Sequence, residues 1–184
     1  MFLLLAVQAC DGPLLKIWHN VDLSEEFTAE KTDEIRTFED YQALEARLFA
    51  QLESEVYAQV GTGSAYQLVR YSKGSISDPQ DDKPNWNRSF ELTQTSPVGG
   101  VLLLHGMSDS PYSLRSLARS LHARGYWVLG LRMPGHGTAP AGLLHVRVAD
   151  MIAATRLGMA HLHDRLGDKP VHMVGYSTGA ALAL

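Results

Sequence analysis

The chain has 184 residues, which is enough for one domain with a substantial core and too few to argue for two. Hydrophobic residues make up 45% of it and charged residues 20%, as in an ordinary soluble globular protein. The formal net charge of −4, without a strongly basic run, gives no electrostatic case for nucleic acid as a partner. None of the histidines stands in a metal-ligand spacing such as HExxH, so no metal is predicted.

Residues 1–10 hold a short apolar run, residues 2–7, and the chain's one cysteine, Cys10. A single cysteine excludes an internal disulfide, and the run is far too short to span a bilayer as a helix. It resembles the end of a secretory signal, and with Cys10 it resembles a bacterial lipobox, in which the cysteine is lipidated. A frayed N-terminus, or a start codon assigned too late, explains it equally well. The sequence therefore leans towards the cell envelope or secretion, with membrane anchoring through Cys10, and leaves the cytoplasm open.

Residues 11–88 are expected to form an N-terminal extension with one long helix and a polar loop. Its first part, residues 11–36, is mixed and acidic and is expected to wrap the surface. Thr37 and Asp40 have the spacing of a capping box at the start of a helix that ends near Gly61. The apolar side chains of this helix share one face: Phe38, Tyr41, Leu44, Leu48, Leu52 and Val56.

That apolar face is expected to pack against the edge of the main sheet. A lid over an active site is the less favoured interpretation. After the helix, residues 72–88 are rich in Ser, Gly, Pro, Asp and Asn, a composition that predicts a long loop.

Strand and helix patterns alternate over residues 89–184. Apolar runs at 101–104 and 126–131 predict buried strands, and a third strand is predicted over 170–174. Phe90 and Leu92 alternate with polar residues as in a half-exposed strand. One helix is expected between Ser110 and Gly125, with Leu114, Leu117, Ala118 and Leu121 inward. A longer one is expected over about 146–166, with Val148, Met151, Ile152, Met159, Leu162 and Leu166 inward. This order predicts an α/β fold with an open, mostly parallel sheet and helices on both faces.

Residues 175–179 match the pattern G-x-S-x-G between an apolar strand and a helix of small residues. A serine on such a tight strand-to-helix turn has a strained backbone and an exposed hydroxyl, so Ser177 is the predicted nucleophile. The turn at 104–107 follows another predicted strand and faces the same crevice, because ligands bind at the carboxyl ends of parallel strands. We predict that the backbone N–H groups of Met107 and Thr178 form an oxyanion hole.

Two histidines lie close to these motifs in the sequence. His105 precedes the serine and sits in a turn, which favours a role in shaping the loop over a role as the catalytic base. His136 stands between two glycines and is likewise interpreted as structural.

As a set, these motifs resemble the α/β-hydrolase superfamily, in the branch of serine esterases, monoacylglycerol-lipase-like enzymes and S33-type peptidases. Residues 105–107 resemble its oxyanion turn, residues 134–137 the P-G-H-G loop of its lysophospholipase-like members, and residues 175–179 its nucleophile elbow. Many relatives have an aspartate before P-G-H-G, where this chain has Arg132 and Met133. Residues 11–88 match nothing in the family.

The resemblance implies hydrolysis of carboxylic esters, lipid-like or small, through an acyl-enzyme on Ser177 and without a metal or organic cofactor. A peptidase, an acyltransferase and a non-catalytic binding protein of the same fold stay open. The family's triad also needs an acid and a histidine after the serine, whereas only seven residues follow Ser177 and none of them titrates. We therefore expect residues 89–184 to be the N-terminal half of the hydrolase core, truncated, nearly inactive alone and prone to aggregate.

Overall fold

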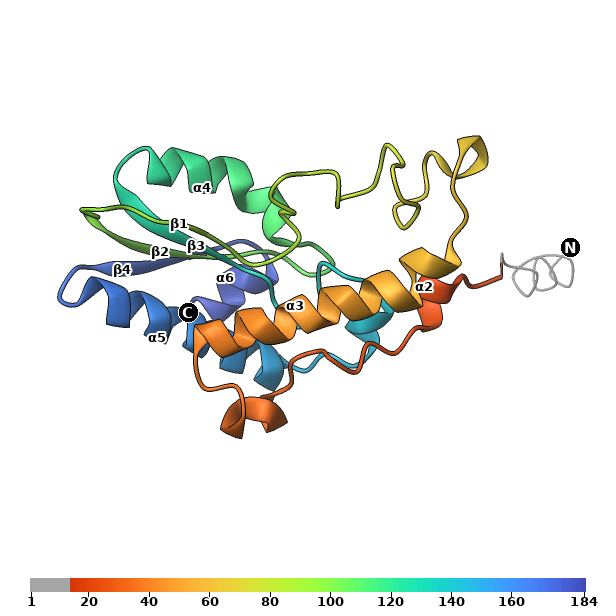
Figure 1. Cartoon of the computed structure of the whole chain (residues 1–184). Coiled ribbons are helices and arrows are strands. Elements are labelled where there is room, and N and C mark those ends of the chain that lie inside the picture. Colours follow the sequence, from red (N-terminus) through yellow and green to blue (C-terminus); the bar gives the residue numbers. More distant parts are fainter. Residues whose placement is uncertain (1–13) are drawn as a thin grey trace, which may run out of the picture.

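The computed structural model describes residues 14–184 (Figure 1), so the apolar run and Cys10 lie outside the described residues. Its centre is a four-stranded sheet with the order β1-β3-β2-β4. The strands are β1 (Phe90–Leu92), β2 (Gly99–Leu104), β3 (Tyr126–Leu131) and β4 (Val171–Gly175). Strands β3, β2 and β4 are parallel, and β1 pairs antiparallel with β3. This topology confirms the predicted open, mostly parallel sheet.

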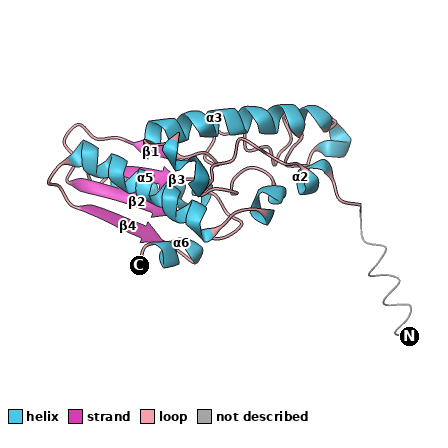
Figure 2. Cartoon of the chain, turned by 90° about the horizontal axis from the view of Figure 1, so that it is seen from below, coloured by secondary structure: helices cyan, strands magenta, loops and turns pink. Residues whose placement is uncertain are grey.

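Helices cover both faces of the sheet (Figures 1 and 2). On one face, a 3-10 turn (Pro111–Leu114) and α4 (Arg115–His122) pack on Val101, Leu103 and Val128. On the other face, α5 (Val148–Leu166) packs on the alternate side chains, Leu102, Leu104, Leu129 and Leu131. The short helix α6 (Thr178–Leu182) follows β4. The two faces use alternate residues because successive side chains of a strand point in opposite directions.

Three side chains predicted to point inward are exposed instead. Leu117 of α4 is 39% exposed, and Val148 and Ile152 of α5 are 62% and 38% exposed. Helix α5 approaches the sheet through small residues, since a Cβ on Gly158 would lie only 3.1 Å from a methyl carbon of Leu102. That close approach selects a buried stripe on which Val148 and Ile152 do not lie: Met151, Ala154, Thr155, Gly158, His161, Leu162 and Leu166.

Helix α3 (Phe38–Glu55) begins with the predicted capping box: the Asp40 amide donates to Thr37 Oγ1 at 3.1 Å, and the Thr37 amide donates to the Asp40 carboxylate at 3.0 Å. All six residues of its predicted apolar face are buried. The first half of that face packs on the sheet beside α5, as expected, and the second half packs on the N-terminal segment. The helix ends at Glu55 rather than near Gly61, because a 3-10 turn (Tyr57–Gln59) follows.

The segment before α3 does more than wrap the surface. It contains α2 (Ile17–Asn20) and a 3-10 turn (Ala29–Asp33). Leu23, Phe27 and Ile35 are buried, and Phe27 and Ile35 share a core cluster with strand residues of the sheet. Single apolar side chains therefore hold this otherwise acidic segment against the core, because burying the apolar surface of each one is favourable. After α3, a 3-10 turn (Ser64–Tyr66) precedes the predicted loop. Residues 72–88 contain no helix or strand, as expected.

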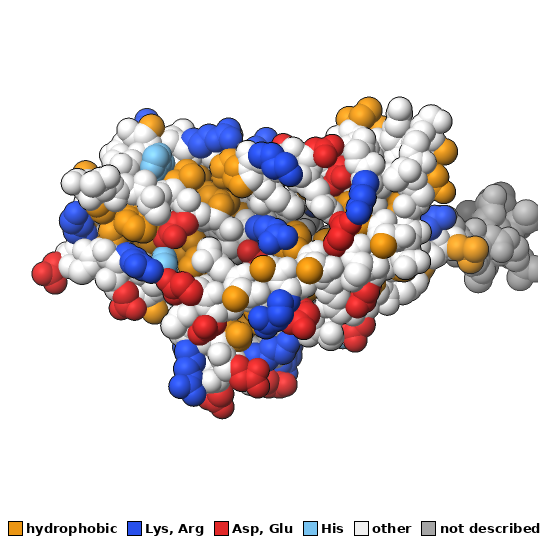
Figure 3. Space-filling view, in the orientation of Figure 1, with side chains coloured by type: hydrophobic (Ala, Val, Ile, Leu, Met, Phe, Trp, Pro, Cys, Tyr) orange, Lys and Arg blue, Asp and Glu red, His pale blue; other side chains and the backbone are white. Residues whose placement is uncertain are grey.

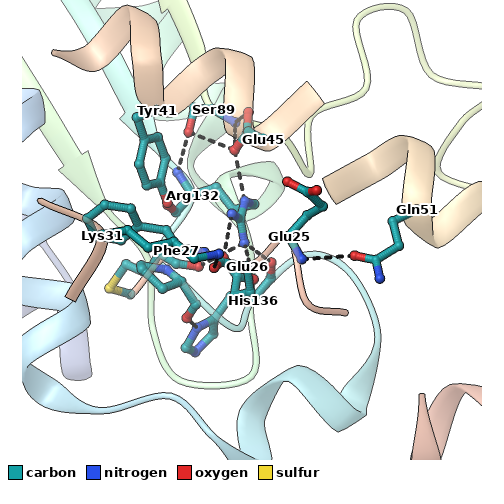
Figure 4. A network of polar contacts seen from close by, with 12 residues as sticks. Glu25, Glu26, Phe27, Lys31, Tyr41, Glu45, Gln51, Ser89, Arg132 and His136 are labelled. Carbon is teal, nitrogen blue, oxygen red and sulfur yellow. Dashed lines mark hydrogen bonds and ion pairs between the residues drawn. The ribbon is translucent and has the colours of Figure 1, made fainter. Parts of the chain in front are cut away.

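A buried ion cluster joins this N-terminal segment to the P-G-H-G loop (Figure 4). Arg132, at the end of β3, is completely buried; its Nε donates to Glu45 at 2.8 Å and its terminal nitrogens donate to Glu26 at 2.9 Å. Another of its bonds, 3.0 Å long, reaches the carbonyl of His136. Burial alone would lower the pKa of Arg132, but the two glutamates raise it well above its ordinary value, so Arg132 is a cation. Arg132 thus has its carboxylate partners in the segment before α3 and in α3 itself.

Acidic and basic side chains are interspersed on the face of the molecule shown in Figure 3. Among residues 14–184, no helix has both the length and the apolar character that crossing a membrane requires.

Candidate active site

Ser177 occupies the tight turn between β4 and α6. Its backbone has φ 53° and ψ −124°, a combination that residues other than glycine rarely adopt and that costs about 1–3 kcal/mol. The side chain is exposed and makes no capping hydrogen bond to α6. The serine hydroxyl is therefore presented to a ligand in a strained conformation that the surrounding structure must maintain.

The flanking glycines let the elbow pack directly on the turn that follows β2. A Cβ on Gly179 would lie 2.2 Å from the carbonyl oxygen of Leu104, and a Cβ on Gly175 would lie 2.2 Å from the carbonyl oxygen of Gly179. The Tyr176 amide also donates to the Leu104 carbonyl at 3.3 Å. The two glycines are thus required by close backbone approach between the two motifs.

We expect Gly179→Ala to lower the free energy of unfolding by about 3 kcal/mol, because the new methyl group meets backbone that cannot rotate away. Gly167→Ala is the control: Gly167 has a restrictive φ of 59°, but a Cβ there meets nothing within 4 Å. Its expected loss is about 1 kcal/mol. Urea denaturation of both variants measures the difference, and equal losses would show that the contact with Leu104 is unimportant.

A tyrosine and an aspartate connect the elbow to the 105–109 turn. The Tyr176 ring lies against Gly106, where an added Cβ would be 3.0 Å from the ring, and its hydroxyl donates to the Asp109 carboxylate. This hydrogen bond raises the pKa of Tyr176. Burial would raise the pKa of Asp109, but hydrogen bonds from Tyr176 and the Ser110 amide lower it, so Asp109 is ionised. Sequence reasoning missed this pair, although the position of Asp109, three residues after Gly106 in a polar turn, was a signal.

The two predicted oxyanion donors lie on these adjoining segments. Met107 follows Gly106 in the turn, and Thr178 follows Ser177 as the first residue of α6. Within the part of the chain that the structure describes, neither backbone N–H group donates a hydrogen bond to another residue. Both amides are therefore free to donate to a ligand.

His105 is committed to the loop structure. It is completely buried; its Nε2 accepts a 3.0 Å hydrogen bond from the Met133 amide, and its Nδ1 lies 2.9 Å from the Gly106 carbonyl. These partners assign the proton to Nδ1 and leave no lone pair for a proton from Ser177. Burial lowers the pKa of His105 to about 4, so the ring is neutral at pH 7. The geometry fits the predicted loop-shaping role rather than that of a base.

The low pKa of His105 predicts acid sensitivity. The unfolded state takes up a proton near the ordinary pKa of 6.5, whereas the folded state does so only near 4. Stability contributed by the neutral ring is thus complete above about pH 6.5 and is lost as pH falls towards 4. Between pH 7 and pH 5, this loss should be about 2 kcal/mol.

Urea denaturation at the two pH values measures the loss. His105→Gln, whose amide oxygen can accept the Met133 bond without titrating, should lose about 2 kcal/mol less than the wild type over this interval. An identical pH dependence in the variant would contradict the assignment to His105.

His136, in the P-G-H-G loop, is also buried and neutral. Its Nδ1 lies 2.8 Å from the Pro134 carbonyl, which can only accept, so the proton is on Nδ1. Burial lowers the pKa of the ring below its usual value. The remaining nitrogen, Nε2, is buried without a hydrogen-bond partner among the described residues. Sequence reasoning gave no sign of this unpartnered atom.

Metal ligation has no support in residues 14–184, where no three His, Cys, Asp or Glu side chains group closely enough to hold an ion. His161 instead lies 2.7 Å from the Glu91 carboxylate and 3.4 Å from that of Glu39. It joins β1 and α3 to α5, which is a structural role.

Comparisons with known proteins relate the second half of the chain to known hydrolases. Residues 95–184 match the family model described as serine aminopeptidase, S33. A thermostable monoacylglycerol lipase from Bacillus sp. (strain H-257) is 34% identical over 91 residues, which cover 50% of this chain and 35% of the relative. A solved structure from work on LipS and LipT, two metagenome-derived lipolytic enzymes, is 33% identical with a TM-score of 0.49; the match covers 53% of this chain and 38% of the other.

Over residues 95–184 the chain is therefore similar to members of the α/β-hydrolase superfamily. It spans 35% of the length of the curated relative that it matches.

Proposed function

We propose that the protein is a serine hydrolase of carboxylic esters, lipid-like or small, and that Ser177 is its nucleophile. The observation that carries this proposal is the elbow itself: an exposed serine held at φ 53° and packed by Gly179 onto the turn after β2. A backbone with that strain persists only where its surroundings enforce it, and such strain concentrates at functional sites. The name of the curated relative, a monoacylglycerol lipase, supports esters as the substrate class.

In this mechanism, Ser177 Oγ attacks the ester carbonyl and the backbone amides of Met107 and Thr178 donate to the oxyanion that forms. Collapse of the tetrahedral intermediate breaks the bond to the alcohol and leaves the acyl group on Ser177. Water then attacks the acyl-enzyme and releases the acid. The Tyr176–Asp109 hydrogen bond holds the turn and the elbow together throughout.

The proton of Ser177 must pass to a base, as in other serine nucleophiles. His105 does not fit this role, because both of its ring nitrogens are engaged. In this superfamily the triad runs nucleophile, acid, histidine in chain order, so we assign the base to a histidine that follows the nucleophile in the intact protein.

Peptidase activity is the second candidate, favoured by the description of the matching family model. Two substrates distinguish esterase from peptidase activity: p-nitrophenyl butyrate and the p-nitroanilide of butyric acid. They share the acyl group and differ in the bond that is broken, an ester or an amide. We expect release of p-nitrophenol and at least about a hundredfold slower cleavage of the anilide. Faster cleavage of the anilide would replace the esterase by a peptidase, and binding without turnover of either would favour a non-catalytic protein of the same fold.

A further inference from the structure

The turn that carries Met107 has a strained residue next to the proposed oxyanion donor. Ser108 has φ 57°, and among residues 14–184 the only other non-glycine residue with a positive φ is Ser177. Each of these serines is the chain neighbour of a proposed donor, Ser108 of Met107 and Ser177 of Thr178. Such strain persists only where surrounding contacts enforce it, so other parts of the structure must hold the turn.

Contacts within the turn do not explain how it is held. The Asp109 amide donates to the Gly106 carbonyl, but at 3.4 Å this hydrogen bond is long. Met107 and Ser108 are both exposed, so packing does not fix them either. Ser108 is the third residue of a four-residue turn, a position where a positive φ favours glycine. The direction of the Met107 amide therefore depends on contacts at the ends of the turn.

Side chains fix both ends of the turn. At its start, Nδ1 of the buried His105 ring lies 2.9 Å from the Gly106 carbonyl. At its end, the Asp109 carboxylate accepts hydrogen bonds from the Ser110 amide at 2.7 Å and from the Tyr176 hydroxyl. His105 belongs to the same segment as the turn, whereas Tyr176 belongs to the elbow. The bond from Tyr176 therefore ties the position of the turn to that of the nucleophile.

Tyr176 is well placed for this task because it immediately precedes Ser177. Its ring packs on Gly106, where an added Cβ would lie 3.0 Å from the ring, and its hydroxyl bonds to Asp109. One side chain thus contacts the first and the last residue of the turn. A hydrogen bond to an ionised carboxylate is about twice as strong as one between neutral groups, which suits a contact that must hold a strained turn.

We propose that Tyr176 and Asp109 are positioning residues for the hydrolysis: their hydrogen bond holds the turn at 106–109 so that the Met107 amide points at the oxyanion formed at Ser177. The inference rests on the proposed function. Neither side chain touches the substrate in this mechanism, and both act through the direction of the Met107 N–H. A contact that matters only once the oxyanion has formed contributes to kcat and leaves KM unchanged.

The test is Tyr176→Phe in the intact protein, since phenylalanine keeps the ring on Gly106 and removes only the hydroxyl. We expect kcat for p-nitrophenyl butyrate to fall at least about tenfold, with KM within about twofold of the wild type. A trifluoromethyl ketone adds to Ser177 and places its oxygen in the same oxyanion hole. Its affinity should therefore fall by the same factor as kcat/KM.

Asp109→Asn is a second variant that keeps the shape of the side chain and leaves a neutral acceptor for Tyr176. It should lower kcat about threefold, because the hydrogen bond is weakened and not removed. Combined with Tyr176→Phe, it should cost no more than Tyr176→Phe alone, since both changes act on one hydrogen bond.

Tyr66→Phe is the matched control. It removes the same hydroxyl from a tyrosine that is 38% exposed, against 44% for Tyr176, and lies in the 3-10 turn after α3. Its kcat and KM should stay within about twofold of the wild type.

Ser177→Ala is assayed alongside, so that failure of the positioning role and failure of the hydrolysis can be told apart. Activity that depends on Ser177 but is unchanged in Tyr176→Phe would overturn the positioning role alone. Additive losses in the double variant, or a loss that appears in KM and not in kcat, would do the same. Activity that survives Ser177→Ala, or a wild type without turnover, would overturn the proposed hydrolysis and the positioning role with it.

Discussion

In the intact protein, replacing Ser177 with alanine is expected to lower kcat/KM for p-nitrophenyl butyrate by about a thousandfold or more. The loss is large because the acyl-enzyme cannot form without the hydroxyl, and the remaining amides of Met107 and Thr178 only stabilise an oxyanion. The fold should be unchanged, since the Ser177 side chain makes no capping hydrogen bond that alanine would remove. Steady-state kinetics with purified wild type and variant measure the effect.

Ser54→Ala provides the control for this experiment. Ser54 is an exposed serine on α3 that hydrogen-bonds only within its own helix. Its replacement should leave kcat/KM within about twofold of the wild type, since a surface change of this kind has little effect. If Ser177→Ala retains most of the activity, the nucleophile is another residue and the elbow is structural.

The second large effect is expected at the buried ion cluster. Glu45→Ala should lower the free energy of unfolding by about 3–5 kcal/mol. Glu45 is 3% exposed, accepts from Arg132 Nε at 2.8 Å, and accepts from both the amide and the hydroxyl of Ser89. Its removal leaves a fully buried arginine with Glu26 as its remaining carboxylate partner, and leaves the Ser89 amide unpaired. Removing one partner of a buried ion pair is costly because the other charge stays uncompensated in the protein interior, where water does not solvate it.

Arg47→Ala is the matched control, because Arg47 lies on the same helix and pairs with Glu25 at 2.9 Å. That pair is exposed, with 54% and 39% of the two side chains accessible, so its loss should cost less than about 1 kcal/mol. Chemical denaturation of both variants gives the comparison. Similar losses would mean that the Arg132 cluster contributes no more than a surface ion pair.

The elbow and the sheet could be predicted because their signals are local. An apolar strand, a G-x-S-x-G turn and a helix of small residues are contiguous in the sequence. The alternation of strands and helices along the chain predicts parallel strands joined by crossover helices. The capping box of α3 is similarly local and is formed as expected. The assignments of Met107 and Thr178 as oxyanion donors rest on the same local motifs and stay predictions.

The Arg132 cluster could not be predicted, because its partners are remote. Glu26 and Glu45 precede Arg132 by 106 and 87 residues, and no spacing rule connects residues that far apart. The sequence showed an arginine two residues before the P-G-H-G loop, without indicating its partners.

The prediction that Val148 and Ile152 point inward was wrong for a different reason. Helical periodicity is compatible with neighbouring stripes of the same helix, and the small residue Gly158 determines which stripe faces the sheet.

The unpartnered nitrogen of His136 was equally invisible in the sequence. Whether a histidine in a glycine-rich loop is satisfied depends on the atoms around it, and here the Pro134 carbonyl fixes the proton on the other ring nitrogen. The cleft of about 780 Å³ between the loop at 70–82 and the P-G-H-G loop likewise exists only in the folded chain. Such sites become visible only once tertiary contacts are known.

The central claim is that Ser177 is a reactive nucleophile, and covalent labelling tests it most directly. The intact protein is treated with an alkyl fluorophosphonate, which phosphonylates activated serines, and the modified peptide is located by mass spectrometry. We predict one label per chain, on Ser177, and no label in Ser177→Ala. Labelling of a different residue, or no labelling of a protein that hydrolyses p-nitrophenyl butyrate, would contradict the account.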